Sequence, residues 1–163
     1  MPITLTQTAY TYDELSDAAK ETARDWYRQG ALNYEWWDFV YDDADRIAKI
    51  LGIEIDRKGK HTPAIYFSGF WNQGDGACFE GSYAYAKGAH KRIREYAPLD
   101  NELHRIADRL YALQRRNFFR LSANVTHSGR YCHEFCTSIF VNRDSHPIDA
   151  DTAEDLADIL RDF

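Results

Sequence analysis

The sequence has few of the features that mark exported, membrane-spanning or disulfide-bonded proteins. Its 163 residues include three cysteines, Cys78, Cys132 and Cys136, and an odd, scattered set does not form a disulfide framework. No apolar run approaches the roughly 18 residues that span a bilayer. The N-terminus MPITLTQTAY lacks the basic head and apolar core of a leader peptide. We therefore expect a protein of the reducing cytoplasm that does not contact a membrane.

Positive charge is scarce towards both ends of the chain. Residues 1–56 contain 5 Lys/Arg against 12 Asp/Glu, and residues 121–163 contain 3 against 8, whereas residues 57–120 contain 12 against 6. This distribution predicts two faces of opposite sign. The length fits one domain with one hydrophobic core, so we predict a single domain over residues 1–163.

Regular spacing of apolar residues predicts five helices, at about residues 11–29, 34–51, 87–96, 100–116 and 149–163. Gly30 and Gly52 are expected to end the first two. Asp100 or Asn101 can begin the fourth helix, and Asp149 or Asp151 the last. No capping residue follows the last helix, so we expect further residues after it. The helix at 87–96 is basic but has no aromatic platform beside it, so we expect no direct nucleic-acid binding there.

Two aromatic-rich segments between the helices are typical of β-hairpins. Residues 65–85 turn at Gln73-Gly74-Asp75-Gly76, and residues 118–142 turn at Ser128-Gly129. A two-residue turn in the second segment would pair His127 with Arg130 and Asn124 with His133. With a short strand at 53–57, these patterns predict an α+β fold: one antiparallel sheet of four to five strands built from the two hairpins, with helices packed on one face.

The residues Cys132, His133 and Cys136, with His127 nearby, have the composition of a metal site. On an extended strand, however, Cys132 and Cys136 would lie about 13 Å apart, and His133 would point to the opposite face. Two ligands of one zinc ion must lie within roughly 4 Å of each other. Unless this segment is a loop, we therefore predict no metal site, and we expect no cofactor.

Cys78 is a candidate nucleophile. The run from Asp75 to Phe79 resembles the Asp-Gly-x-Cys signature of ovarian-tumour-type cysteine proteases, a family in which the cysteine begins a helix whose dipole lowers the thiol pKa. Here residues 80–83 continue as a strand, which favours a buried structural cysteine. A thiol hydrolase that uses Cys78 with His127 or His133 stays open as an alternative, although we expect no enzyme.

Three groups of residues are candidates for binding. Gly69 and Gly81 lie inside predicted strands, where glycine marks a close approach of another group. They predict a docking tip or a shallow aromatic pocket, with Trp71, Gln73 and Asp75 at the turn. The carboxylates of Asp38, Asp42 and Asp45 form either a solvated helix face or a surface that mimics a phosphate backbone. His133, on the polar row beside Asn124, is the histidine to test.

Three longer phrases, TYDELSDAAKETARDWYR, YFSGFWNQGDGACFEGSY and LSANVTHSGRYCHEFCTSI, resemble a family of small bacteriophage and prophage accessory proteins. Its members share a Ser-Gly-Phe-x-x-Gln-Gly-Asp-Gly-Ala-x-Phe core, and some are labelled antitoxin-like. The resemblance covers most of the chain, although the loop at 58–63 is longer than expected for the family. It implies an accessory gene of a phage or mobile element.

Accessory proteins of this kind without a catalytic motif act by binding. We therefore expect a stoichiometric inhibitor of a host antiviral defence complex, similar to anti-CRISPR proteins. It would dock its acidic face or hairpin tip onto a bacterial host protein or ribonucleoprotein complex and block a basic nucleic-acid channel. One alternative is an antitoxin-like module that neutralises a toxin. Another is a nucleotide-signal sponge in which Arg92, Arg94 or Arg120 pairs the phosphates.

Overall fold

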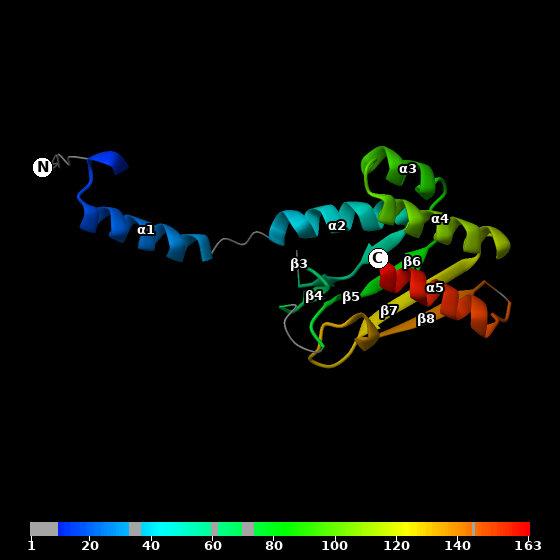
Figure 1. Cartoon of the computed structure of the whole chain (residues 1–163). Coiled ribbons are helices and arrows are strands. Elements are labelled where there is room, and N and C mark those ends of the chain that lie inside the picture. Colours follow the sequence, from blue (N-terminus) through cyan, green and yellow to red (C-terminus); the bar gives the residue numbers. More distant parts are fainter. Residues whose placement is uncertain (1–9, 33–36, 60–61, 70–73, 145) are drawn as a thin grey trace, which may run out of the picture. The chain divides into compact units, whose positions relative to one another are not determined.

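The computed structural model describes residues 10–32, 37–59, 62–69, 74–144 and 146–163, which divide into two compact units, Met1–Asp38 and Phe39–Phe163 (Figure 1). The first unit contains a short 3-10 helix η1 (Tyr12–Glu14) and helix α1 (Asp17–Leu32). One continuous helix from Thr11 or Asp13, ended by Gly30, was expected; α1 instead runs past Gly30 to Leu32. Residues Tyr12–Glu14 form a separate 3-10 turn, because the Glu14 carboxylate accepts hydrogen bonds from the backbone N–H and the hydroxyl of Thr11, both at 2.8 Å. The helix restarts at Ser16, whose carbonyl accepts from Lys20 N at 2.8 Å.

The predicted helices of the second unit are confirmed, with small shifts at their ends. They are α2 (Trp37–Leu51), α3 (Ala89–Tyr96), α4 (Asn101–Arg116) and α5 (Ala150–Asp162). Asp100 caps α4 by accepting from the backbone N–H groups of Glu102 and Leu103, and Asp149 caps α5. Gly52 ends α2 at a φ of +90°. No helix among the described residues is both long and apolar enough to span a membrane.

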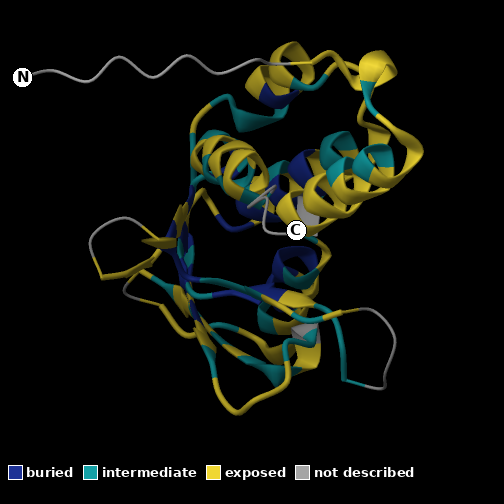
Figure 2. Cartoon of the chain, turned by 90° about the vertical axis from the view of Figure 1, so that its left-hand side faces the viewer, coloured by how far each residue is buried: buried dark blue, intermediate teal, exposed yellow. Residues whose placement is uncertain are grey.

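The main sheet is antiparallel, and the α+β class is confirmed. Its four strands are β1 (Ile53–Ile55), β6 (Gly81–Ala84), β7 (Leu121–His127) and β8 (Thr137–Arg143), in the order β1-β6-β7-β8. One face of the sheet is buried, and it packs with residues of α2, α3, α4 and α5 into a single core. The opposite face carries alternating exposed residues such as Asn124 and Phe140 (Figure 2).

Three extended segments, residues 53–58, 62–67 and 77–84, each contain two short strands that pair with different partners. The short strands β2 (Arg57–Lys58) and β3 (Thr62–Pro63) pair with each other, and so do β4 (Ile65–Phe67) and β5 (Ala77–Phe79). Between the pairs, Asp56 N donates to Glu80 O, Glu80 N to Ala64 O, and Ala64 N to Asp56 O, at 2.9, 2.9 and 2.7 Å. We call this ring of three residues the strand junction. Beyond it the first predicted hairpin continues as the β4–β5 pair, while β6 joins the main sheet.

The pairing predicted within the second hairpin is wrong. His127 pairs with Thr137 rather than with Arg130, and Asn124 pairs with Phe140 rather than with His133. The connection therefore runs from residue 128 to residue 136 instead of turning at Ser128-Gly129. The core decides this register: it places the apolar positions of β8, Ile139 and Val141, beside those of β7.

Candidate functional site

Two loops that are far apart in the sequence lie against each other at one end of the second unit. They are the β4–β5 connection, of which residues 68–69 and 74–76 are described, and the β7–β8 connection at 128–136. Gly74 has a φ of +95°, and a Cβ added there would lie 2.9 Å from the Tyr131 ring. A Cβ on Gly76 would lie 3.0 Å from the carbonyl oxygen of Cys132. Glycine at both positions is therefore what lets the two backbones approach this closely.

The β7–β8 connection is held by its own hydrogen bonds. It contains a 3-10 turn, η2 (Glu134–Cys136), in which Cys136 N donates to His133 O at 2.8 Å. The imidazole Nδ1 of His133 accepts from Phe135 N at 3.2 Å, and a ring nitrogen of His127 lies 2.8 Å from Tyr131 O. Side-chain bonds to the backbone of this kind fix a loop that has no strand partner.

Aromatic and charged side chains project from this end. The exposed fractions of Tyr131 and Phe135 are 48% and 71%. Phe135 stacks on the His133 ring with centroids 5.2 Å apart, and the Arg130 guanidinium lies 5.0 Å from the Tyr131 centroid. On the facing loop Asp75 accepts a hydrogen bond from Ser68 at 3.0 Å. We call Asp75, Arg130, Tyr131, His133 and Phe135 the aromatic tip.

A polar cluster beneath the aromatic tip joins it to the strands. Glu80 accepts from the Tyr66 hydroxyl at 2.6 Å and from His127 N at 3.1 Å. The Tyr66 ring lies 4.5 Å from the His127 ring, centroid to centroid, at an interplanar angle of 34°, and Lys58 Nζ lies 3.0 Å from the Tyr66 centroid. The bond to Glu80 raises the pKa of Tyr66 to about 12, and the bonds from Tyr66 and His127 lower the pKa of Glu80. A carboxylate so engaged is a weak proton acceptor, so this cluster supports structure better than acid–base chemistry.

Asp75, predicted at the tip of the first hairpin, and His133, predicted on the polar row of the second, are brought to neighbouring loops. The sequence placed them on separate hairpins and gave no reason for them to meet. Trp71 and Gln73 lie outside the described residues. The sequence reasoning did not single out Arg130, Tyr131 or Phe135, because it placed them within paired strands. Their spacing around Ser128-Gly129 would have identified an exposed aromatic loop had the register been known.

The three carboxylates of the predicted acidic face have different surroundings. Asp38 is exposed in the first turn of α2 and belongs to the first unit, whereas Asp42 and Asp45 belong to the second. The Asp45 side chain is 16% exposed and pairs with Lys49 at 2.6 Å and Arg57 at 2.9 Å. Asp45 therefore joins α2 to β2, and its charge is neutralised within the protein rather than presented to a binding partner.

The other predicted chemistries find less support in the geometry. Cys132 and Cys136 lie in the loop and its 3-10 turn rather than on a strand, so the strand-distance argument against a metal site does not apply. Among the described residues, however, no group of three His, Cys, Asp or Glu side chains could hold a metal ion. Cys78 is buried, which raises its pKa to about 11 and leaves little thiolate at neutral pH.

The arginines proposed for a nucleotide site have structural partners in two of three cases. Arg94 forms a two-bond pair with Asp108 at 3.1 and 2.6 Å. Arg92 donates to the carbonyl oxygen of Ile50 at 3.1 Å. Arg120 is exposed at the start of β7. Two of the three guanidinium groups are therefore already engaged within the protein.

Comparison with known proteins gives a family but no activity. No curated protein and no solved structure matches the chain. Residues 36–163, which include both loops of the aromatic tip, match the domain of unknown function DUF8835, and the chain therefore belongs to the DUF8835 family.

Proposed function

We propose that this protein is a binding protein of bacteriophage or prophage origin that inhibits an antiviral defence complex in the host cytoplasm. It acts by stoichiometric docking on a host protein or ribonucleoprotein, in the manner of anti-CRISPR proteins, and not by catalysis. The observation that carries the proposal is the aromatic tip, where Tyr131 and Phe135 are exposed on a loop fixed by hydrogen bonds and by the glycine contacts.

The composition and rigidity of the tip support docking. Residues that dominate protein–protein binding energy are enriched in Tyr and Arg, and they lie at the centre of an interface. A loop held in one conformation loses less entropy on binding than a mobile one. Arg130 beside Tyr131, with Asp75 on the facing loop, adds charges of both signs that can orient a partner.

The acidic face is a weaker candidate for the docking surface. Asp45 is paired with Lys49 and Arg57, and Asp43 accepts a hydrogen bond from Tyr96. Asp42 and Asp43 are both exposed carboxylates of the second unit on this helix. Charge reversal at Asp45 would break a helix-to-strand contact as well as a docking surface, so Asp42→Lys is the cleaner test of this version.

The experiment combines infection with affinity capture. Bacterial strains that carry defined defence systems, CRISPR effectors among them, express the wild-type chain, Phe135→Ala, Tyr131→Ala or Phe140→Ala, and phage plating efficiency is measured. Phe140 is a matched control because it is a phenylalanine with an exposed fraction of 61% on the open face of the sheet. Tagged proteins then capture the target from the protected strain at low and moderate salt.

We expect the wild-type chain and Phe140→Ala to restore plating and to recover one stoichiometric complex. Loss of a central aromatic anchor typically costs 2 kcal/mol or more, so we expect Phe135→Ala to bind about 30-fold more weakly. Restored plating with both tip variants would contradict the proposal. Capture of the product of an adjacent toxin gene would instead favour the antitoxin-like alternative.

A further inference from the structure

We propose that an apolar cavity in the second unit binds a medium-chain carboxylic acid, with the acyl chain between α2 and α5 and the carboxylate at Arg161. The Arg161 guanidinium lies 5.6 Å from the Phe135 ring centroid, so this site adjoins the aromatic tip. The proposal does not depend on the function proposed above. It lies between α2, α4 and α5 on one side and strands of the main sheet and of the β4–β5 pair on the other.

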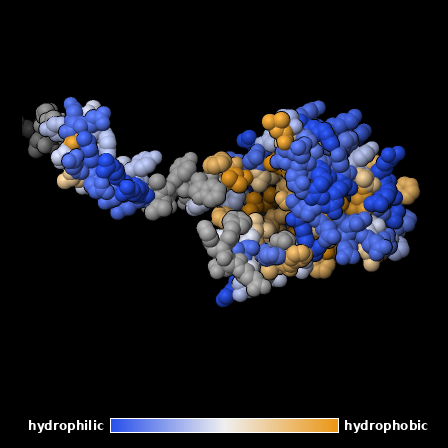
Figure 3. Space-filling view, viewed as in Figure 1, coloured by the Kyte–Doolittle hydropathy of each residue, from blue (hydrophilic) through white to orange (hydrophobic). Residues whose placement is uncertain are grey.

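The cavity has a volume of about 230 Å³ and a lining that is mostly aliphatic and aromatic. In the space-filling view an apolar hollow lies between α2 and the end of α5 (Figure 3). Ala44 on α2 and Ala77 on β5 contribute small side chains to the wall, which leaves space that larger residues would fill. An apolar ligand in this hollow would gain dispersion contacts with the lining side chains.

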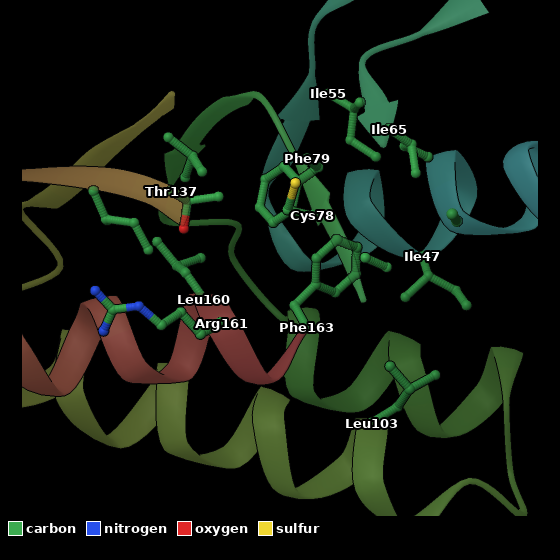
Figure 4. Close-up of a pocket in the computed structure, with 14 residues that line it drawn as sticks. Ile47, Ile55, Ile65, Cys78, Phe79, Leu103, Thr137, Leu160, Arg161 and Phe163 are labelled. Atoms are coloured by element: carbon green, nitrogen blue, oxygen red, sulfur yellow. The ribbon is translucent and has the colours of Figure 1, made fainter. Parts of the chain in front are cut away.

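One end of the cavity is polar. Figure 4 shows Arg161 and Thr137 together at this end, with Ile47 and Leu103 at the other. Arg161 donates through Nη1 to Asp158 at 2.8 Å. Its Nε is buried and has no hydrogen-bond partner among the described residues. Because a buried donor without a partner costs free energy, an acceptor at this end of the cavity would stabilise the bound state.

The charges around the cavity favour an anion. Among its described lining residues, Arg161 carries a positive charge and none is acidic. Asp158, the partner of Arg161, is 55% exposed, so water screens its repulsion of a bound carboxylate. Cys78 also lines the cavity, and because burial raises its pKa to about 11 it contributes a neutral thiol. Guanidinium groups bind carboxylates through two parallel hydrogen bonds, which neutral acceptors cannot match.

The volume limits the size of the apolar part. An engineered apolar cavity of about 150 Å³ holds one benzene molecule, so 230 Å³ accommodates about nine carbon atoms by the same ratio. Octanoate and decanoate are therefore the probes that fit. An acid of this length can place its chain along Ile47 and Phe163 while its carboxylate reaches Arg161.

The test uses the purified full chain and isothermal titration with octanoate and decanoate, below the concentrations at which they form micelles. Decanol is the uncharged comparison, and decylamine carries the opposite charge. A charge-assisted hydrogen bond that replaces an unpaired donor predicts about 10- to 100-fold tighter binding of decanoate than of decanol.

Three variants separate the parts of the site. Arg161→Gln should abolish the preference for decanoate over decanol, whereas Asp158→Asn removes the ion pair but keeps the guanidinium and should retain it. Ala44→Leu fills the cavity and should weaken both ligands at least tenfold, while thermal unfolding of the free protein checks that the variant is folded. Equal affinity for decanoate and decanol, or unchanged binding to a folded Ala44→Leu variant, would overturn the proposal, as would absence of binding to the wild-type chain.

Discussion

Replacement of Gln114 by leucine should destabilise the second unit more than its position on a helix suggests. Gln114 is fully buried, with an exposed fraction of 0%. Its Nε2 donates to the Tyr83 hydroxyl at 3.1 Å and to Leu121 O at 2.8 Å, and its Oε1 accepts from Leu121 N at 3.2 Å. Leu121 lies one residue beyond the last β6–β7 pair, Ala84 with Ser122. The amide therefore takes the place of a neighbouring strand.

The magnitude follows from the three groups that lose their partner. A buried polar group left without a hydrogen bond costs about 1–3 kcal/mol. Three such groups, partly offset by the apolar surface of the new side chain, predict a loss of about 3–6 kcal/mol. Since domains of this size are stable by only about 5–15 kcal/mol, the loss is a large share of the total. At about 2–4 °C per kcal/mol, the melting temperature should fall by roughly 6–24 °C.

The assay is urea unfolding followed by circular dichroism, with thermal unfolding followed in the same way as a second measure. Arg115→Leu is the control, because it makes the same exchange for leucine at the next, exposed position of α4 and should change stability by less than about 0.5 kcal/mol. Tyr83→Phe should cost less than Gln114→Leu, and the two costs should not add, since they share one bond. A Gln114→Leu variant within about 1 kcal/mol of wild type would refute this reasoning.

Three further outcomes are expected. Gly81→Ala should prevent β1 from pairing with β6, because the added Cβ would lie 2.1 Å from Glu54 O; a wild-type circular dichroism spectrum and melting temperature would contradict this. The folded state lowers the pKa of Glu80 from its ordinary 4.5, so its contribution to stability is complete above that pH and is lost as the pH falls through the folded value; Glu80→Gln should flatten this acid dependence, and an unchanged slope of stability against pH would count against the Tyr66 bond. Iodoacetamide at pH 7.5 should alkylate Cys78 at least about 100-fold more slowly than an unperturbed cysteine, since its pKa rises from 9.0 to about 11; fast labelling mapped by mass spectrometry would reopen the thiol-hydrolase alternative.

Local signals predicted the helices well. Asp100 and Asp149 are capping residues that act within one turn of their own position, so the sequence around them was sufficient to place α4 and α5. The glycine at position 81 was correctly associated with a close backbone approach. In each case the cause lies within a few residues or follows from the conformational range of a single residue type.

Features that depend on distant contacts were predicted poorly. Ser128-Gly129 is a strong local turn signal, but packing of Ile139 and Val141 into the core sets the register of β8 and lengthens the loop. Gln114 is polar, which is typical of a surface residue. It is buried because the β6–β7 pairing ends before Leu121, where the Gln114 amide supplies the hydrogen bonds instead. Asp45 resembles its exposed neighbours in sequence, yet Arg57 on β2 engages it. None of these pairings could be derived without the tertiary arrangement.

The strand junction has a consequence for the order in which parts of the protein open. A two-residue hairpin such as β2–β3, or a short pair such as β4–β5, is not stable in water by itself. The ring of hydrogen bonds through Asp56, Ala64 and Glu80 connects both pairs to the main sheet. Local opening of either pair then requires breaking the ring, and amide hydrogens on both should exchange as one cooperative group. The β4–β5 pair helps to hold the aromatic tip, so amide hydrogens of the tip should be protected from exchange to the same extent. The tip is therefore presented to a partner by a group of strands that opens cooperatively.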